Sequence, residues 1–213
     1  MLDVFKKITR IFVKEEPKEE VVQEVENLQE EDTIELVEKA ILATNLNLVP
    51  SPEIINPEGS KSILFLDDIQ HTEILYTGDI RKVKEEYNLE IDRDFKIVMC
   101  LGENAPLIAY KYAVSNNNKI EYGILDITLG CHYNLNGRLV TVDGIDIAIL
   151  LKRCNPDFKF LLCTAHTLNK TNTVVLRYRE KLINHFGFDL ESYYLNKNDR
   201  EPYKIKGLLY ENK

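Results

Sequence analysis

This sequence of 213 residues has no tryptophan, only two methionines and no pair of cysteines at CxxC spacing. Its four cysteines lie far apart, so we expect reduced thiols in a cytoplasmic protein rather than a disulfide framework or a zinc site. No apolar run approaches the ~18 residues that a membrane span needs. The first residues also lack the apolar centre and the small-residue cleavage site of a signal peptide.

Positive charge is scarce and unevenly placed, and the formal net charge is −8. Residues 1–14 carry four basic residues against one acidic residue, whereas residues 15–40 hold eleven acidic residues against two lysines. No basic face or DNA-reading helix stands out, so a nucleic-acid partner is not expected.

The segment 1–14 has a pattern of its own. Its large apolar residues recur on one helical side and its basic residues lie largely on the other, which predicts a basic amphipathic helix. Such a helix can lie on a membrane surface or dock into a partner's groove. The alternatives are a frayed terminus or a helix that packs on its own domain. A cytoplasmic location, with membrane association through this helix, is the corresponding expectation.

Three domain segments are expected. Residues 1–14 form the basic helix, and residues 15–59 form an acidic linker with a helix near 33–44. Prolines and a glycine between Pro50 and Gly59 mark a connector. Residues 60–213 then form the folded domain.

The pattern of residues 60–213 alternates between apolar runs and helical periodicity. Runs at 62–66, 95–101, 120–125, 159–163 and 192–196 predict strands, and the segments between them predict helices. This alternation predicts an α/β fold with a five-stranded parallel sheet and helices on both faces. The helical segment 69–89 is expected to break at Gly78. Asn136-Gly137 predicts a β-hairpin within residues 130–142.

Polar side chains follow four of these strands. The first strand ends in Asp67 and Asp68, the third in Asp126, the fourth in Thr164 and the fifth in Lys197. Each residue alone could be a turn residue or a helix cap. Because the carboxyl ends of parallel strands meet at one edge of a sheet, we expect the set to lie close together.

Converging carboxylates repel one another and are stable only with a cation or with protons. All-oxygen ligation favours Mg²⁺ over zinc. A lysine and a hydroxyl beside such carboxylates are the groups that phosphoryl transfer uses, with one carboxylate as the nucleophile.

Four stretches carry a family resemblance: ILFLDDIQ, GILDITLG, VDGIDIAILLKRCNPDFKFLLCTAHT and YYLNK. On these stretches, residues 61–197 resemble the receiver (CheY-like) domain of two-component response regulators. The sequence departs from that family in the hairpin insertion, in long connections before Asp126 and before Lys197, in Asn198 where the family usually has proline, and in a short last helix.

The resemblance implies roles for individual residues. It implies that Asp126 is the phosphoacceptor and that Thr164 and Lys197 bind the phosphoryl group. It implies that Mg²⁺ is held by Asp67, Asp68, Asp126 and the backbone carbonyl of Thr128. Further implied roles belong to Tyr194, as the aromatic switch, and to Thr128 and His166, which tune dephosphorylation.

The functional expectation is an atypical single-domain response regulator. It would take its phosphoryl group from a histidine kinase or a phosphotransfer protein and signal through contact with a downstream protein. Its only enzymatic activity would be self-phosphorylation from phosphohistidine and autodephosphorylation. The alternative is a phosphorylation-independent adaptor with a receiver fold in a membrane-associated assembly. A phosphatase of the haloacid dehalogenase type is disfavoured, because that chemistry needs an aspartate two residues after the nucleophile.

Overall fold

The structure is a computed structural model that describes residues 30–70, 73–87, 89, 91–115, 119–164, 173–187, 194–197 and 201–210. The chain divides into two compact units, Met1–Glu35 and Leu36–Lys213, and the fold described below is that of the second. The amphipathic helix predicted for residues 1–14 lies outside the described residues.

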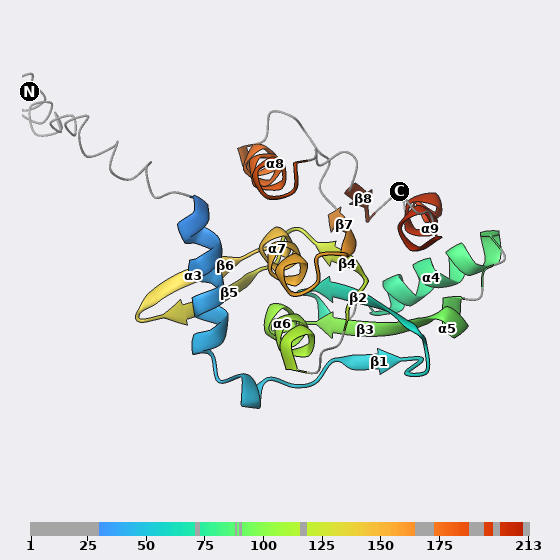
Figure 1. Cartoon of the computed structure of the whole chain (residues 1–213), viewed down its shortest axis with the longest axis horizontal. Helices are drawn as coiled ribbons and strands as arrows, with labels where there is room; N and C mark the ends of the chain where they lie inside the picture. Colours follow the sequence, from blue (N-terminus) through green and yellow to red (C-terminus); the bar gives the residue numbers. More distant parts are fainter. Residues whose placement is uncertain are drawn as a thin grey trace, which may run out of the picture. The chain divides into compact units, whose positions relative to one another are not determined.

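The centre of the molecule is a six-stranded sheet (Figure 1). Its strands are β1 (Glu53–Ile55), β2 (Lys61–Asp67), β3 (Phe95–Leu101), β4 (Tyr122–Asp126), β7 (Lys159–Thr164) and β8 (Tyr194–Asn196). The spatial order is β1-β3-β2-β4-β7-β8. The last five strands in this order run parallel, which confirms the predicted parallel sheet.

Strand β1 was not predicted. It runs antiparallel to β3 at the sheet edge and lies N-terminal to the predicted start of the folded domain at residue 60. Only three residues long and directly preceded by Pro52, it is too short to show a periodic pattern. Prolines tend to lie beside edge strands, so the connector pattern and the strand are compatible.

Helices cover both faces of this sheet. They are α4 (Glu73–Tyr87), α5 (Ile91–Asp94), α6 (Ala105–Ser115), α7 (Gly144–Cys154), α8 (Thr173–Phe186) and α9 (Pro202–Tyr210). One core cluster joins the buried faces of α4 and α9 to alternate strand residues such as Phe65. Figure 1 shows α6 and α7 side by side, away from α4 and α9. Of the described helices, none combines the length and the apolarity that crossing a bilayer takes.

Helix α4 passes through Gly78 without interruption, so the predicted break at this glycine is wrong. A glycine inside a helix costs only about 1 kcal/mol relative to alanine. The buried residues Tyr76, Ile80 and Val83 lie on one side of α4 and pack in the core. Their burial offsets that cost, since each large side chain contributes roughly 1.5–3 kcal/mol.

The predicted helix near 33–44 corresponds to α3 (Glu30–Ala43). Val37, Ala40 and Ile41 are fully buried on it. At the edge of this buried side, Glu38 accepts a hydrogen bond from the hydroxyl of Tyr110 on α6 at 2.7 Å. Part of the segment predicted to be a linker is therefore packed on the folded unit. The short 3-10 helix η1 (Leu46–Leu48) follows α3.

The predicted hairpin is present as β5 (Cys131–Leu135) and β6 (Arg138–Val142), which form a separate two-stranded sheet. Asn136 and Gly137 connect them with φ values of 52° and 86°. Two successive positive φ values match a turn whose twist suits a hairpin, and this explains the choice of Asn-Gly. The hairpin lies between β4 and α7, directly after the predicted phosphoacceptor strand.

Candidate functional site

The sheet order brings two strand ends together. β2 pairs with β3 on one side and with β4 on the other, and all three strands are parallel. The chain therefore adds β3 on one side of β2 and later strands on the opposite side, and the strand order reverses between β2 and β4. Ligands of open α/β sheets bind outside the carboxyl ends of the strands at this type of switch point. The residues at these ends are Asp67, the last residue of β2, Asp68, which follows it, and Asp126, the last residue of β4.

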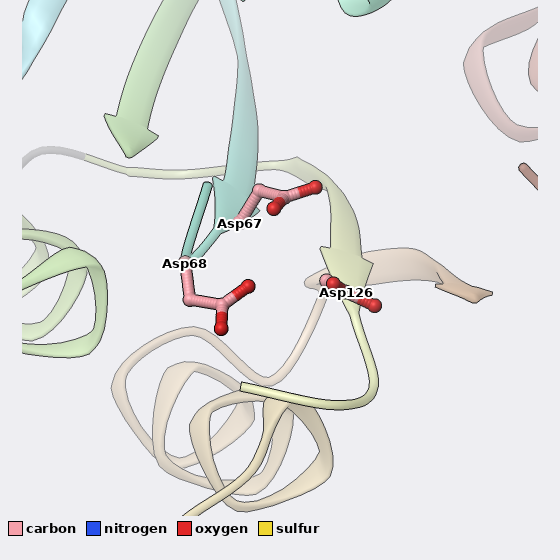
Figure 2. A group of neighbouring side chains, drawn as sticks. All are labelled: Asp67, Asp68 and Asp126. Carbon is pink, nitrogen blue, oxygen red and sulfur yellow. The ribbon is translucent and has the colours of Figure 1, made fainter. Parts of the chain in front are cut away.

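The three aspartates face one another at this edge (Figure 2). One carboxylate oxygen from each lies within 4.8 Å of those of the other two. The side chain of Asp67 is 0% exposed and that of Asp126 is 7% exposed, while Asp68 is half-buried at the rim. Two buried acids and one rim acid thus form a group with a surplus of negative charge, which we call the pocket.

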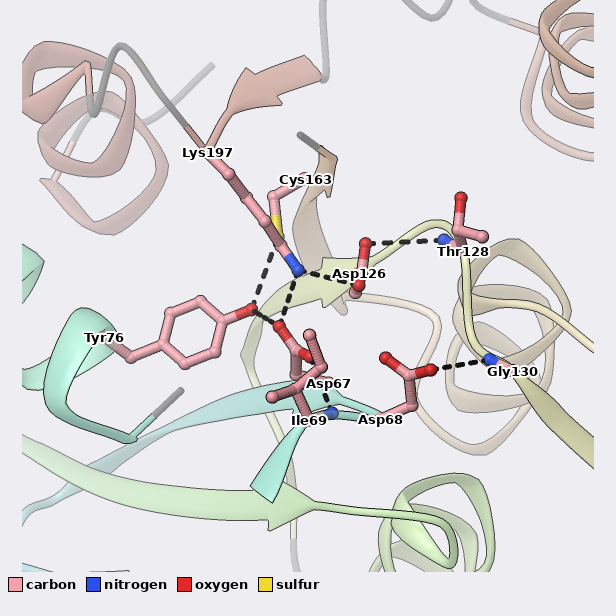
Figure 3. A network of polar contacts seen from close by, with 9 residues as sticks. All are labelled: Asp67, Asp68, Ile69, Tyr76, Asp126, Thr128, Gly130, Cys163 and Lys197. Carbon is pink, nitrogen blue, oxygen red and sulfur yellow. Dashed lines mark hydrogen bonds and ion pairs between the residues drawn. The ribbon is translucent and has the colours of Figure 1, made fainter. Parts of the chain in front are cut away.

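Lys197 supplies the positive charge of this pocket. Its Nζ donates to Asp67 Oδ2 and to Asp126 Oδ2, each at 2.7 Å (Figure 3). Its backbone N–H donates to the carbonyl of Thr164 at 3.1 Å, which joins the ends of β8 and β7. Thr164 is buried at the tip of β7. The structure therefore brings Asp67, Asp68, Asp126 and Lys197 together, and it places Thr164 beside them.

The order of the five parallel strands is 2-1-3-4-5 when they are numbered along the chain. This is the order of the flavodoxin-like folds, to which CheY belongs. The tips of the first, third, fourth and fifth strands carry the aspartate pair, the aspartate, the threonine and the lysine. The five parallel strands therefore have the CheY-like, flavodoxin-like topology.

Solved structures of response regulators are similar to this chain. A response regulator of Burkholderia pseudomallei, solved with a phosphorylated aspartic acid, a calcium ion and citrate, has a TM-score of 0.43 and 18% identity over 72% of this chain and 68% of its own. The response regulator RcsB of Salmonella typhimurium has a TM-score of 0.39 and 15% identity over 70% of this chain and 57% of its own. No protein-family profile and no curated protein matches the sequence.

Burial and neighbouring charges shift the pKa values of Asp126 and Lys197. Burial raises the pKa of Asp126 to about 6, although the hydrogen bond and charge of Lys197 act in the opposite direction. Burial alone would lower the pKa of Lys197, but its neighbours, including the carboxylates of Asp126 and Asp67, outweigh burial and raise it. Above pH 6 the pocket therefore contains an ionised, unusually basic carboxylate that contacts a fully charged ammonium group.

The pocket also fits a small divalent cation. Within the part of the chain that the structure describes, Asp68 makes one hydrogen bond, which its Oδ2 accepts from the N–H of Gly130 at 2.8 Å. Asp68 Oδ1 is thus available as a ligand. Oxygen ligands from two or three carboxylates are the donor set that Mg²⁺ prefers. Lys197 balances only one of the three negative charges, so a cation would relieve the remaining repulsion.

Two further predicted residues, Thr128 and Tyr194, are among the described residues. The backbone N–H of Thr128 donates to Asp126 Oδ1 at 3.4 Å, and its side chain is exposed beside the pocket. Tyr194 on β8 is half-buried, and the Nζ of Lys204 lies 5.7 Å from its ring centre. The metal-ligand role of the Thr128 carbonyl and the switch role of Tyr194 stay predictions. His166 lies outside the described residues.

Sequence reasoning missed two contacts of the pocket. The hydroxyl of Tyr76 donates to Asp67 Oδ2 at 2.7 Å and lies 3.5 Å from the Sγ of Cys163 (Figure 3). A signal for Tyr76 was present, because it shares a helical side with Ile80 and Val83, and a buried tyrosine hydroxyl needs a partner. No local pattern could have indicated the bond between Gly130 and Asp68, because the two residues come from different strand ends.

Proposed function

We propose that this chain is an atypical response regulator that accepts a phosphoryl group on Asp126. The observation that carries the proposal is the position of Lys197, whose ammonium group lies 2.7 Å from both Asp126 and Asp67. A lysine in this position can contact the unmodified carboxylate and, after transfer, the negatively charged oxygens of a phosphoryl group attached to it. The rim residue Asp68 gives the pocket the surplus charge that favours a cation.

The chemistry assigned to Asp126 is a single displacement at phosphorus. One of its carboxylate oxygens forms a P–O bond while the P–N bond of a donor phosphohistidine breaks, and the electron pair stays on the imidazole nitrogen. The raised pKa of Asp126, about 6, makes the carboxylate more basic than usual while it is still ionised at neutral pH. Lys197 then lies close to the oxygens on which negative charge gathers.

Asp67, Asp68, Asp126 and the carbonyl of Thr128 are the proposed ligands of Mg²⁺. When bound, this ion would neutralise charge on the phosphoryl oxygens and on the crowded carboxylates. The donor in the cell would be a histidine kinase or a phosphotransfer protein, and the output would be contact with a downstream protein. Residues 1–14 are the proposed link to a membrane surface or to a partner's groove.

The proposal is tested by incubating the protein with acetyl phosphate and Mg²⁺ and measuring its intact mass. We expect the mass of one phosphoryl group to be added, and we expect no addition when EDTA replaces Mg²⁺. Asp126→Ala should prevent the addition, whereas Asp157→Ala, a change to an exposed aspartate in an ion pair with Lys119, should not. Failure of the unmodified protein to gain mass would contradict the proposal.

One observation favours the alternative, an adaptor that works without phosphorylation. The hairpin directly follows the acceptor strand and exposes Leu139, whose relative accessibility is 69%. A leucine exposed on this inserted hairpin is available to a constant protein contact. Under this alternative, a partner would bind the unmodified protein and the Asp126→Ala variant equally well in a pull-down experiment.

A further inference from the structure

Tyr76 connects helix α4 to the acidic pocket. Its side chain is 4% exposed, and its ring packs against Phe65 with 4.7 Å between ring centres. Its hydroxyl donates to Asp67 Oδ2 at 2.7 Å, and Figure 3 shows the ring reaching the pocket from the side opposite Asp68. The same hydroxyl lies 3.5 Å from the Sγ of Cys163. These contacts fix both the ring and the direction of its hydroxyl.

Asp67 depends on this hydroxyl because its carboxylate has no contact with solvent. Its side chain is 0% exposed, and Oδ1 accepts the backbone N–H of Ile69 at 2.9 Å. Oδ2 accepts two donors at the same distance of 2.7 Å, the hydroxyl of Tyr76 and the Nζ of Lys197. A buried carboxylate that loses a hydrogen-bond donor is strongly destabilised. The free-energy cost of moving Lys197 away from Asp67 is therefore lower while the hydroxyl of Tyr76 still donates to the same oxygen.

The ammonium group of Lys197 contacts two carboxylates at once. Its Nζ lies at 2.7 Å from Asp126 as well as from Asp67, so it divides its charge between the predicted phosphoacceptor and a buried neighbour. A phosphoryl group on Asp126 would draw the ammonium group away from Asp67. If Lys197 were the only donor to Asp67 Oδ2, this movement would leave that oxygen buried without a partner.

We propose that Tyr76 is a positioning residue for phosphoryl binding, which holds Asp67 through its hydroxyl so that Lys197 can turn to the phosphoryl group on Asp126. This inference rests on the proposed function and extends it to a residue of the first helix of the receiver-like fold. Tyr76 does not touch the phosphoryl group in this account. Its effect passes through Asp67 and Lys197.

The matched test compares Tyr76→Phe with Tyr110→Phe. Both tyrosines are buried, and both donate to a carboxylate at 2.7 Å, but the partner of Tyr110 is Glu38, on α3. The two variants therefore lose the same type of bond in different places. The probes are Mg²⁺ alone and beryllofluoride with Mg²⁺, where beryllofluoride imitates a phosphoryl group on Asp126.

We expect Tyr76→Phe to bind beryllofluoride about tenfold more weakly, the effect of one hydrogen bond to a charged group. Its affinity for Mg²⁺ alone should fall by less than about threefold, because Tyr76 contacts only one of the proposed Mg²⁺ ligands, Asp67. Tyr110→Phe should change neither affinity. Equal affinities for Tyr76→Phe and the unmodified protein, or equal losses for both probes, would overturn the inference and leave the proposed function standing.

Absence of beryllofluoride binding by the unmodified protein would overturn the proposed function and this inference with it. A second background covers the case in which Tyr76→Phe folds poorly. Asp67→Asn removes a proposed Mg²⁺ ligand and should itself weaken beryllofluoride binding, so the single variant is the reference for the double variant. Because the residue at 67 is then neutral and no longer needs two donors, adding Tyr76→Phe should fold normally and weaken beryllofluoride binding further by less than about twofold. A tenfold loss in this background, or a double variant that still fails to fold, would contradict the route through Asp67.

Discussion

Two regions of this chain contain a lysine that lies between two aspartates. In the pocket, Lys197 contacts Asp67 and Asp126, each at 2.7 Å. A second group, which we call the α7 triad, consists of Lys181 on α8 with Asp143 and Asp146 at the start of α7, at 3.1 and 2.7 Å. All three side chains of the triad are at most 9% exposed. The chemistry of the two groups is nearly the same.

The difference lies in what the carboxylate oxygens do. In the α7 triad every oxygen has a partner. Asp143 Oδ1 accepts the N–H groups of Ile145 and Asp146, and Asp146 Oδ2 accepts the N–H of Asp143, which forms a capping box. Lys181 contacts the remaining two oxygens. The triad therefore begins a helix and joins α7 to α8, and each of its carboxylate oxygens has a partner within the protein.

The pocket has one more acid and one oxygen to spare. Its three aspartates face a single lysine, and Asp68 Oδ1 accepts no hydrogen bond from any described residue. The comparison teaches that an aspartate–lysine contact does not by itself mark a site. Surplus negative charge together with an unused oxygen at the rim is what suits a group to bind a cation.

The largest expected effect separates the two lysines. Lys181→Met leaves two buried carboxylates without a cation, so we expect the free energy of unfolding to fall by about 3–5 kcal/mol. Mg²⁺ should not restore it, because the two oxygens that this variant frees are buried and come from only two carboxylates. Lys197→Met should lose less stability in the presence of Mg²⁺ than in its absence. Urea unfolding of both variants with and without Mg²⁺ measures this, and equal responses to Mg²⁺ would break the comparison.

The pH dependence of stability should divide in the same way. Burial raises the pKa of Asp146 to about 6, so the folded state binds this proton more tightly than the unfolded chain does. Stability should therefore fall as the pH rises from about 4 to about 6, and Asp146→Asn should remove on the order of 2 kcal/mol of that decrease.

Asp126 also has a pKa raised by burial, to about 6, and it contributes a decrease with the same sign. Mg²⁺ favours the ionised carboxylate and should remove this share, but it should leave the Asp146 share unchanged. Urea unfolding at pH 4–7, with and without Mg²⁺, separates the two contributions. A decrease that Mg²⁺ abolishes entirely would mean that the triad does not titrate as described.

A smaller effect is expected at the rim. An alanine Cβ at position 130 would lie 3.0 Å from Asp68 Oδ2, so Gly130→Ala must push that carboxylate away from the backbone N–H. We expect about threefold weaker Mg²⁺ binding, which corresponds to less than 1 kcal/mol. Gly78→Ala serves as the control, because an alanine Cβ there meets no atom within 4 Å. Unchanged Mg²⁺ binding by Gly130→Ala would show that the hydrogen bond from Gly130 to Asp68 does not affect the Mg²⁺ site.

Much of the fold could be predicted because it follows from patterns within single segments. The apolar runs predicted the five parallel strands. Asn136-Gly137 predicted the hairpin, because this dipeptide readily adopts the two positive φ values that the turn needs. Strand β1 and the unbroken helix at Gly78 could not be predicted in this way. Both depend on tertiary packing, which outweighs weak local preferences.

The pocket shows the same division. The convergence of Asp67, Asp126 and Lys197 followed from strand order, because parallel strand ends must share an edge. The contact of Tyr76 with Asp67 depends on how deeply α4 packs, and the α7 triad depends on the position of Lys181 along α8. The spacing of residues along the sequence does not predict either contact.

The most direct test of the account is calorimetric titration with Mg²⁺ of the unmodified protein, Asp68→Asn and Asp146→Asn. We predict one binding site in the unmodified protein, binding weakened by about tenfold or more in Asp68→Asn, and unchanged binding in Asp146→Asn despite its altered stability. Absence of a Mg²⁺ site in the unmodified protein, or equal loss of binding in the two variants, would contradict the claim that the strand-tip aspartates form a cation-binding phosphoacceptor pocket.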